Sequence, residues 1–126
     1  PDMRLPIQYA LSFPERLYLK GERLNLFKQQ RLEFFEPDTN KFKCLALAYE
    51  AIDKGGNMPC ILNAANEVVN AAFRRNECSF LGMADVIEQT MQQATFDKNP
   101  NLDVYLQTDA EARTIAQRLV LKASTL

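Results

Sequence analysis

The stretch LNAANEVVNAAF, residues 62–73, limits the possible folds of this chain more than any other segment. An α-helix advances about 100° per residue, so a helix here gathers its polar side chains on one arc about 100° wide. The arc consists of Asn63, Asn66, Glu67 and Asn70. Small and apolar residues cover the rest of the surface, which is typical of a helix that contacts several neighbours. The sequence therefore predicts a bundle of helices with this segment close to its centre.

Three interpretations of this polar arc are open. Asparagine is a weaker helix former than the lysine, glutamate or glutamine of an ordinary solvated face. The amides could form a structural seam that hydrogen-bonds a neighbouring helix end or residues 1–36. The arc could also be a plain solvated face, or a catalytic or ligand-binding site. A general base at Glu67 would need a nucleophile, a metal or a second carboxylate nearby, and no suitable spacing supplies one. We favour the structural seam.

The segment before this helix also has helical periodicity. A helix is predicted over 38–54, with Asp38 as its N-cap. Gly55 and Gly56 end it. Its apolar residues recur at helical spacing and are expected to face the core: Phe42, Leu45, Tyr49 and Ile52.

The central helix is predicted over 58–75, and two further helices complete the predicted bundle of four. The first of these two is expected over 81–94. It has one apolar side: Phe80, Met83, Ile87, Met91 and Ala94. The last helix is predicted to begin at a capping box, the sequence TDAE, in which the Thr108 hydroxyl accepts from the backbone of Glu111. Its expected buried stripe is Ala112, Ile115, Ala116, Leu119 and Ala123.

Residues 1–36 differ from the rest of the chain. Prolines and a glycine interrupt them, leaving room for one short helix over 5–13. The alternation in QRLEFFEP, residues 30–37, is compatible with a strand. The expected fold is therefore mainly α, with an irregular segment of residues 1–36 and a helical bundle of residues 37–126.

The composition excludes several classes of function. The net charge of −1 and the absence of a basic tract argue against nucleic-acid or anionic-membrane partners. The chain has no histidine, which excludes a Ser/His/Asp or Cys/His catalytic arrangement. Its three widely spaced cysteines predict free thiols in a reducing cytoplasm, with no zinc site. No apolar run is long enough for a membrane span. The first residue is Pro1, so we expect a piece of a longer protein.

Several stretches together resemble a known family. PDMRLPIQYALSFPERL, FFEPDTNKFKCLALAYEAIDKGG and ILNAANEVVNAAF are similar, in this order, to the C-terminal part of the 1-deoxy-D-xylulose 5-phosphate reductoisomerase family. The likeness continues through FLGMADVIEQTM and DAEARTIAQRLV. By this resemblance, residues 1–36 are the tail of a catalytic domain and a linker, and residues 37–126 are a C-terminal four-helix bundle.

The resemblance also implies an activity. The family rearranges 1-deoxy-D-xylulose 5-phosphate and reduces the product to 2-C-methyl-D-erythritol 4-phosphate, in the non-mevalonate route to isoprenoids. It uses NADPH with Mg²⁺ or Mn²⁺ and is expected to be a cytoplasmic homodimer. Its metal-, phosphate- and dinucleotide-binding residues precede PDMR, so this chain is expected to hold no catalytic, cofactor-binding or metal-binding residue and to be inactive alone. Pro1 and Met3 would line the wall of the substrate pocket. The alternative is a free-standing helical protein-interaction module.

Overall fold

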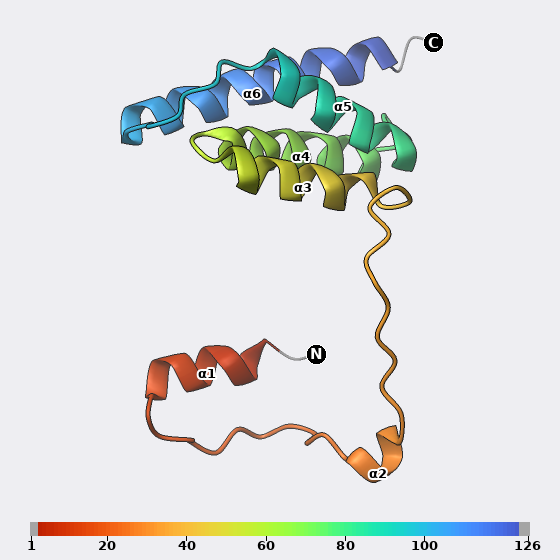
Figure 1. The fold of residues 1–126 in the computed structure, drawn as a ribbon, viewed down its shortest axis with the longest axis vertical. Coiled ribbons are helices and arrows are strands. Elements are labelled where there is room, and N and C mark those ends of the chain that lie inside the picture. Colours follow the sequence, from red (N-terminus) through yellow and green to blue (C-terminus); the bar gives the residue numbers. More distant parts are fainter. Residues whose placement is uncertain (1–2, 124–126) are drawn as a thin grey trace. The chain divides into compact units, whose positions relative to one another are not determined.

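The structure, a computed structural model, describes residues 3–123, with side chains through Lys122. These residues form six helices and no strand, which confirms the mainly-α expectation (Figure 1). The chain separates into two compact units, Pro1–Glu36 and Pro37–Leu126. The first contains α1 (Arg4–Ser12) and α2 (Leu26–Gln29), and the second contains the four remaining helices. No helix in the described part of the chain is long and apolar enough to cross a membrane.

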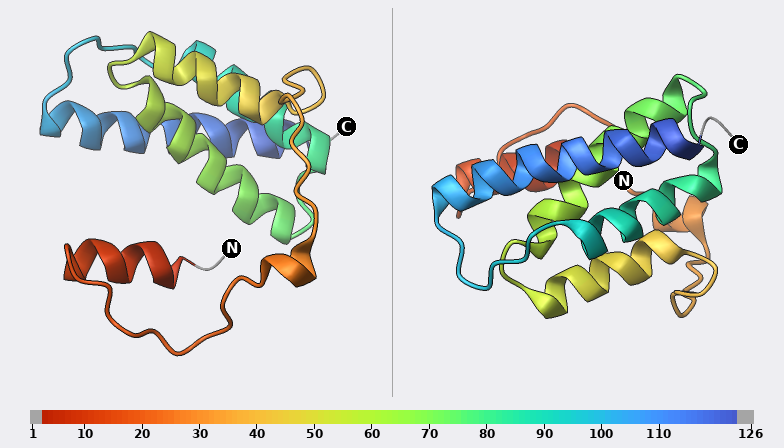
Figure 2. Two further views of the ribbon diagram at one scale, coloured as in Figure 1. Left: turned by 60° about the horizontal axis from the view of Figure 1, so that its bottom comes forward. Right: turned by 90° about the horizontal axis from the view of Figure 1, so that it is seen from above.

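The second unit is built around α4 (Met58–Arg74). This helix packs against α6 (Leu102–Ala123), α5 (Phe80–Gln93) and α3 (Lys43–Lys54), an arrangement that Figure 2 shows from two further sides. The buried core residues of α4 are mainly small: Met58, Ile61, Ala64, Ala65, Val69 and Ala72. Because alanine leaves little side chain between backbones, neighbouring helices approach α4 closely. The wide apolar arc of residues 62–73 is therefore explained by three packed neighbours.

The helix α3 differs from its prediction in both its start and its buried face. Asp38 is not the N-cap: its Oδ1 accepts from the backbone N of Asn40 and of Lys41, at 3.1 and 2.9 Å, and this turn delays the helix to Lys43. The residues of α3 that enter the core are Leu47 and Ala51. Of the predicted core stripe, Leu45 is half-buried and the other members are exposed: Phe42, Tyr49 and Ile52. Periodicity detects an apolar arc, but it does not tell which of two apolar arcs contacts the bundle.

The prediction of a capping box at Thr108 is wrong. The helix α6 already begins at Leu102, where Asn101 Oδ1 accepts from the backbone N of Val104 at 2.9 Å. Thr108 therefore lies inside α6 and is buried. Ala112, Ala116 and Leu119 of the predicted stripe are buried, Ile115 is half-buried, and the side chain of Ala123 lies outside the described residues. The pattern TDAE describes a possible helix start, but the preceding residues can themselves extend the helix.

The limits of α4 and α5 agree with the sequence. α5 begins after Ser79, whose Oγ accepts from the backbone N of Gly82 at 3.1 Å. Its buried residues include Ile87 and Met91, as predicted, whereas Phe80 lies exposed at the first position of the helix.

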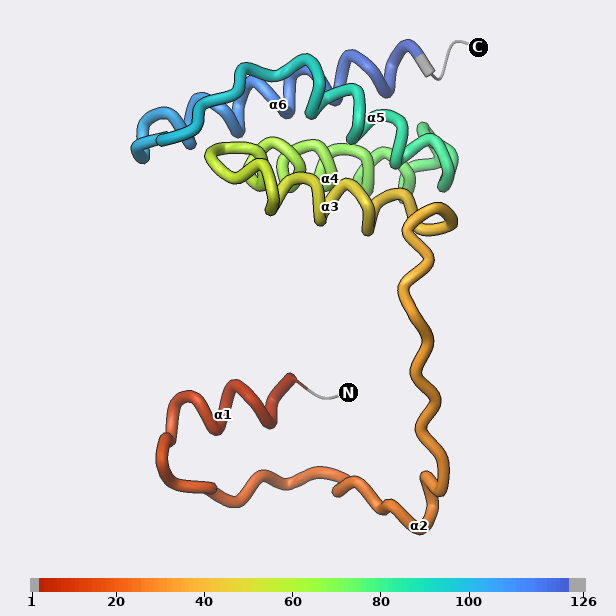
Figure 3. The backbone as a smooth tube through the Cα atoms, in the orientation of Figure 1, coloured from red at the N-terminus to blue at the C-terminus, as the bar shows by residue number. Residues whose placement is uncertain are grey.

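The first unit has little packing of its own. None of the described residues 3–36 is buried. The helix α1 agrees with the predicted helix over 5–13, and α2 is capped by Asn25, whose Oδ1 accepts from Phe27 N at 3.0 Å. The possible strand over 30–37 is not formed: after α2, residues 30–38 have no regular secondary structure (Figure 3). A strand needs a neighbour to satisfy its backbone hydrogen bonds, and the described residues offer none.

Candidate functional site

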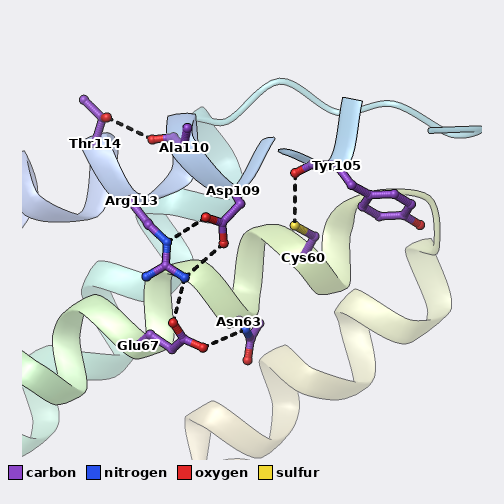
Figure 4. Close-up of polar contacts among 8 residues, drawn as sticks. All are labelled: Cys60, Asn63, Glu67, Tyr105, Asp109, Ala110, Arg113 and Thr114. Atoms are coloured by element: carbon purple, nitrogen blue, oxygen red, sulfur yellow. Dashed lines mark hydrogen bonds and ion pairs between the residues drawn. The ribbon is translucent and has the colours of Figure 1, made fainter. Parts of the chain in front are cut away.

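Charged side chains connect α4 and α6 on the face that carries the predicted polar arc (Figure 4). Arg113 of α6 donates from Nε to Asp109 Oδ2 at 2.7 Å and from Nη2 to Asp109 Oδ1 at 3.0 Å. The same Nη2 donates to Glu67 Oε2 of α4 at 2.6 Å. Asn63 donates from Nδ2 to the other oxygen of Glu67, Oε1, at 3.2 Å. We call these four residues the Arg113 cluster.

The electrostatics of the Arg113 cluster favour its ionised form. The hydrogen bond from Arg113, and then that from Asn63, lower the pKa of the Glu67 carboxyl below its usual range. The hydrogen bonds to Asp109 and Glu67 raise the pKa of the Arg113 guanidinium above its usual value. Because these side chains are in contact with solvent, the ion pairs are screened and stabilise the bundle only modestly. A carboxylate with a lowered pKa and both oxygens occupied is poorly suited to act as a general base.

The structure places all four residues of the predicted seam on the exposed side of α4: Asn63, Asn66, Glu67 and Asn70. Only Glu67 reaches another helix, through Arg113, while Asn63 orients Glu67 from within α4. The side chains of Asn66 and Asn70 make no hydrogen bond within the described residues. A structural role for these two amides stays a prediction.

A buried amide that the sequence analysis did not single out lies at the start of α4. Asn57 is 1% exposed, and its Nδ2 donates to Thr95 O and to Thr108 Oγ1, both at 2.9 Å. Its Oδ1 accepts from Asp97 N at 2.9 Å, and its backbone N donates to Asp97 O at 3.0 Å. Asn57 therefore joins the α3–α4 turn, the α5–α6 connection and α6 itself.

The glycine before Asn57 is part of the same junction. Gly56 has φ +56°, and a Cβ at this position would collide with the carbonyl oxygen of Asp97. The sequence Gly-Gly-Asn directly before the helix start was the only local signal of this junction. It did not predict the hydrogen bonds of Asn57. The partners of Asn57 lie 38, 40 and 51 residues further along the chain, beyond the reach of any local pattern.

The cysteines are free thiols, as predicted. Cys60 Sγ donates to the carbonyl oxygen of Tyr105 at 3.7 Å (Figure 4), and burial raises the pKa of this thiol. Burial also raises the pKa of Cys78. Both residues are therefore held in the protonated, weakly nucleophilic form.

The carboxylates and thiols of the described residues form no metal-binding cluster. Among them, no group of three or more His, Cys, Asp or Glu side chains is arranged to hold a metal. The Glu67 and Asp109 carboxylates are engaged by Arg113. Of the predicted pocket-wall residues, Pro1 lies outside the described residues, and Met3 is exposed directly before α1. The pocket role of both stays a prediction.

Comparison with known proteins gives consistent results. Residues 1–115 match the family described as DXP reductoisomerase C-terminal domain. The 1-deoxy-D-xylulose 5-phosphate reductoisomerase of Bacteroides fragilis is 60% identical over 122 residues, which are 97% of this chain and 31% of the relative. That of Bacteroides thetaiotaomicron is 59% identical over 120 residues, 95% of this chain and 31% of the relative.

Solved structures agree with this match. The reductoisomerase from Zymomonas mobilis in complex with NADPH has a TM-score of 0.84 and 38% identity, covering 95% of this chain and 32% of that one. A DOX-P reductoisomerase in complex with NADPH, fosmidomycin and magnesium has a TM-score of 0.82 and 32% identity, with the same coverage.

The fold and the Asn57 junction define a helical-bundle domain preceded by an irregular segment. The chain belongs to the DXP reductoisomerase C-terminal domain family. It spans about a third of the length of the curated relatives that it matches.

Proposed function

We propose that this chain is the C-terminal part of an NADPH-dependent reductoisomerase that converts 1-deoxy-D-xylulose 5-phosphate to 2-C-methyl-D-erythritol 4-phosphate in the non-mevalonate route to isoprenoids. The observation that carries the proposal is the 60% identity to a reductoisomerase over 97% of the chain. In this role the bundle supports an active site that other residues of the polypeptide form.

The chemistry of the described side chains supports this role. The Arg113 cluster is internally neutralised except for one negative charge, and the buried polar groups at Asn57 are paired with one another. NADPH and Mg²⁺ or Mn²⁺ would supply the hydride and the polarisation of substrate oxygens. One solved relative is a complex with NADPH, and another is a complex with NADPH, fosmidomycin and magnesium. The family resemblance implies that the groups that bind NADPH and the metal lie in the part of the enzyme outside this chain. Pro1 and Met3 would contribute only apolar contact at the edge of the substrate pocket.

The proposal also covers the binding partners, the oligomeric state and the cellular location of the enzyme. The immediate partner of this chain is the remainder of its own polypeptide, and the complete enzyme is a cytoplasmic homodimer. The near-neutral net charge of −1 and the absence of a basic tract support partners other than nucleic acid or an anionic membrane.

A domain replacement tests the proposal. Residues 1–126 are substituted for the matching third of the Bacteroides fragilis reductoisomerase, and NADPH oxidation is followed with 1-deoxy-D-xylulose 5-phosphate and Mn²⁺. We expect the chimera to turn over substrate and the chain of residues 1–126 alone to show no turnover. An inactive but folded chimera would refute the assignment to this enzyme. Turnover by residues 1–126 alone would refute the supporting role and favour catalytic groups within the bundle.

A further inference from the structure

The outward side of α3 carries apolar side chains that the bundle leaves uncovered. Phe42, directly before α3, is 57% exposed, and within the helix Tyr49 and Ile52 are 52% and 70% exposed. Leu45, on the same side, is half-buried. We call these four residues the α3 outer face. They follow one another at helical spacing, so they form one continuous apolar strip.

α3 is therefore apolar on two sides. Its other side places Leu47 and Ala51 in the core of the bundle, at 4% and 2% exposure. A helix at the surface of a domain needs only one apolar stripe to hold it there. Contiguous exposed apolar residues beyond that stripe mark a contact surface.

Charged groups border the α3 outer face. Lys43 binds Asp85 and Glu88 of α5, at 2.9 and 2.8 Å, which links the start of α3 to α5. Asp53 lies one turn beyond Tyr49 and is exposed. An apolar centre with a polar border is the usual anatomy of a protein–protein contact. Because Leu47 and Ala51 hold α3 in the core, the face keeps one orientation on the bundle.

We propose that the α3 outer face docks against an apolar surface in the part of the reductoisomerase polypeptide that lies outside this chain. The proposal rests on the proposed function. This chain spans 31% of the length of its relatives, so about two thirds of such a polypeptide remain to supply the surface. α3 is also the first helix of the bundle, and only the turn of residues 39–41 and Phe42 separate it from residues 30–38, which have no regular secondary structure. A segment that is covalently linked to its binding surface meets that surface at high effective concentration.

The size of the face favours a tethered occupant over a second copy of the chain. α3 has 12 residues and is about 18 Å long, so a contact one helix wide covers on the order of 200 Å². A stable complex between separate molecules buries about 800 Å² on each partner. A tethered domain does not lose the full translational and rotational freedom of a separate molecule, and a smaller contact is then sufficient.

Hydroxyl-radical labelling of the chimera described above tests the docking. We expect Phe42 and Tyr49 to be labelled several-fold less in the chimera than in residues 1–126 alone. Phe80, exposed at the start of α5, serves as the reference for an open position and is expected to change little. Met58, which is fully buried, should be protected in both proteins and so reports that the bundle is folded. Equal labelling of Tyr49 in two folded proteins would overturn the proposal.

The remaining outcomes distinguish the alternatives. Protection of Tyr49 in residues 1–126 alone would also overturn the proposal, in favour of a second copy if it increases with protein concentration. Ile52→Asp in the chimera should restore labelling of Phe42, whereas Leu106→Asp, at an exposed position of α6, should not. NADPH oxidation is measured on the same samples. An active chimera in which Tyr49 is labelled as strongly as in residues 1–126 alone would refute only the docking. An inactive but folded chimera would refute the proposed function.

Discussion

The two units of the chain contain similar kinds of residues but use them differently. Residues 37–126 bury a continuous core between α3, α4, α5 and α6. Described residues 3–36 contain leucine, isoleucine, phenylalanine and tyrosine as well, yet none of them is buried. Burial requires a second layer of secondary structure opposite the first, and only the bundle has one. The bundle therefore has a core of its own, whereas the described residues of the first unit bury no side chain.

Truncating one isoleucine in each unit gives the largest expected difference. Ile61 is fully buried in α4, so Ile61→Ala should lower the free energy of unfolding of residues 1–126 by about 2–5 kcal/mol. Ile7→Ala, in the exposed α1, should change it by less than about 0.5 kcal/mol. Urea denaturation followed by circular dichroism measures both. Equal effects would show that the first unit takes part in the cooperative core.

Removing one asparagine amide from each unit sharpens the comparison. Asn57→Ala leaves Thr108 and the backbone N of Asp97 without their buried partner and should cost about 1–3 kcal/mol. Asn25→Ala removes the cap of α2, but α2 has no buried residue, so the main unfolding transition should not move. The midpoints of the same urea titrations give the result. A neutral Asn57→Ala would mean that water replaces the amide without cost.

Alanine substitutions at two glycines, one in each unit, test the backbone contact between Gly56 and Asp97. Gly56→Ala should destabilise the bundle by about 1–3 kcal/mol, because Gly56 has a positive φ and faces the Asp97 carbonyl. Gly21→Ala meets open space and should leave the thermal midpoint within about 2 °C of the parent. A thermal melt of the two variants compares them directly. If both are neutral, the α3–α4 turn can move away from the α5–α6 connection.

The smallest expected effect concerns the ion pairs and depends on pH. Because the pKa of Glu67 is lowered in the folded state, its contribution is present above the unfolded pKa and is lost as pH falls through the folded pKa. Glu67→Gln should therefore lower the melting temperature slightly at pH 7, and the difference should shrink below pH 4.5 and disappear once the pH is below the lowered pKa of the folded state. Glu33→Gln removes the exposed Arg31–Glu33 pair of the first unit and should have no effect at either pH. A pH-independent effect of Glu67→Gln would contradict a role in the ion pair.

Local sequence patterns predicted the helices but not all of their limits and contacts. The apolar arc of residues 62–73 was sufficient to predict a central helix, because that information lies within one helix. The starts of α3 and α6 were wrong because Asp38 and Thr108 each fit a cap motif, and the motif alone does not exclude a later or an earlier start. The role of Asn57 was missed because its partners are distant in sequence. The exposed α3 outer face was misread for a related reason, since exposure depends on which neighbours are present.

The junction at Gly56 and Asn57 constrains how this domain can change during evolution. Asn57 binds Asp97 only through the backbone N and O of that residue. The side chain at position 97 is therefore free to vary as far as this contact is concerned, while the length of the α5–α6 connection is not. An insertion there would carry the Asp97 peptide groups out of reach of Asn57. Relatives are therefore expected to differ in residue type in this loop more readily than in residue number.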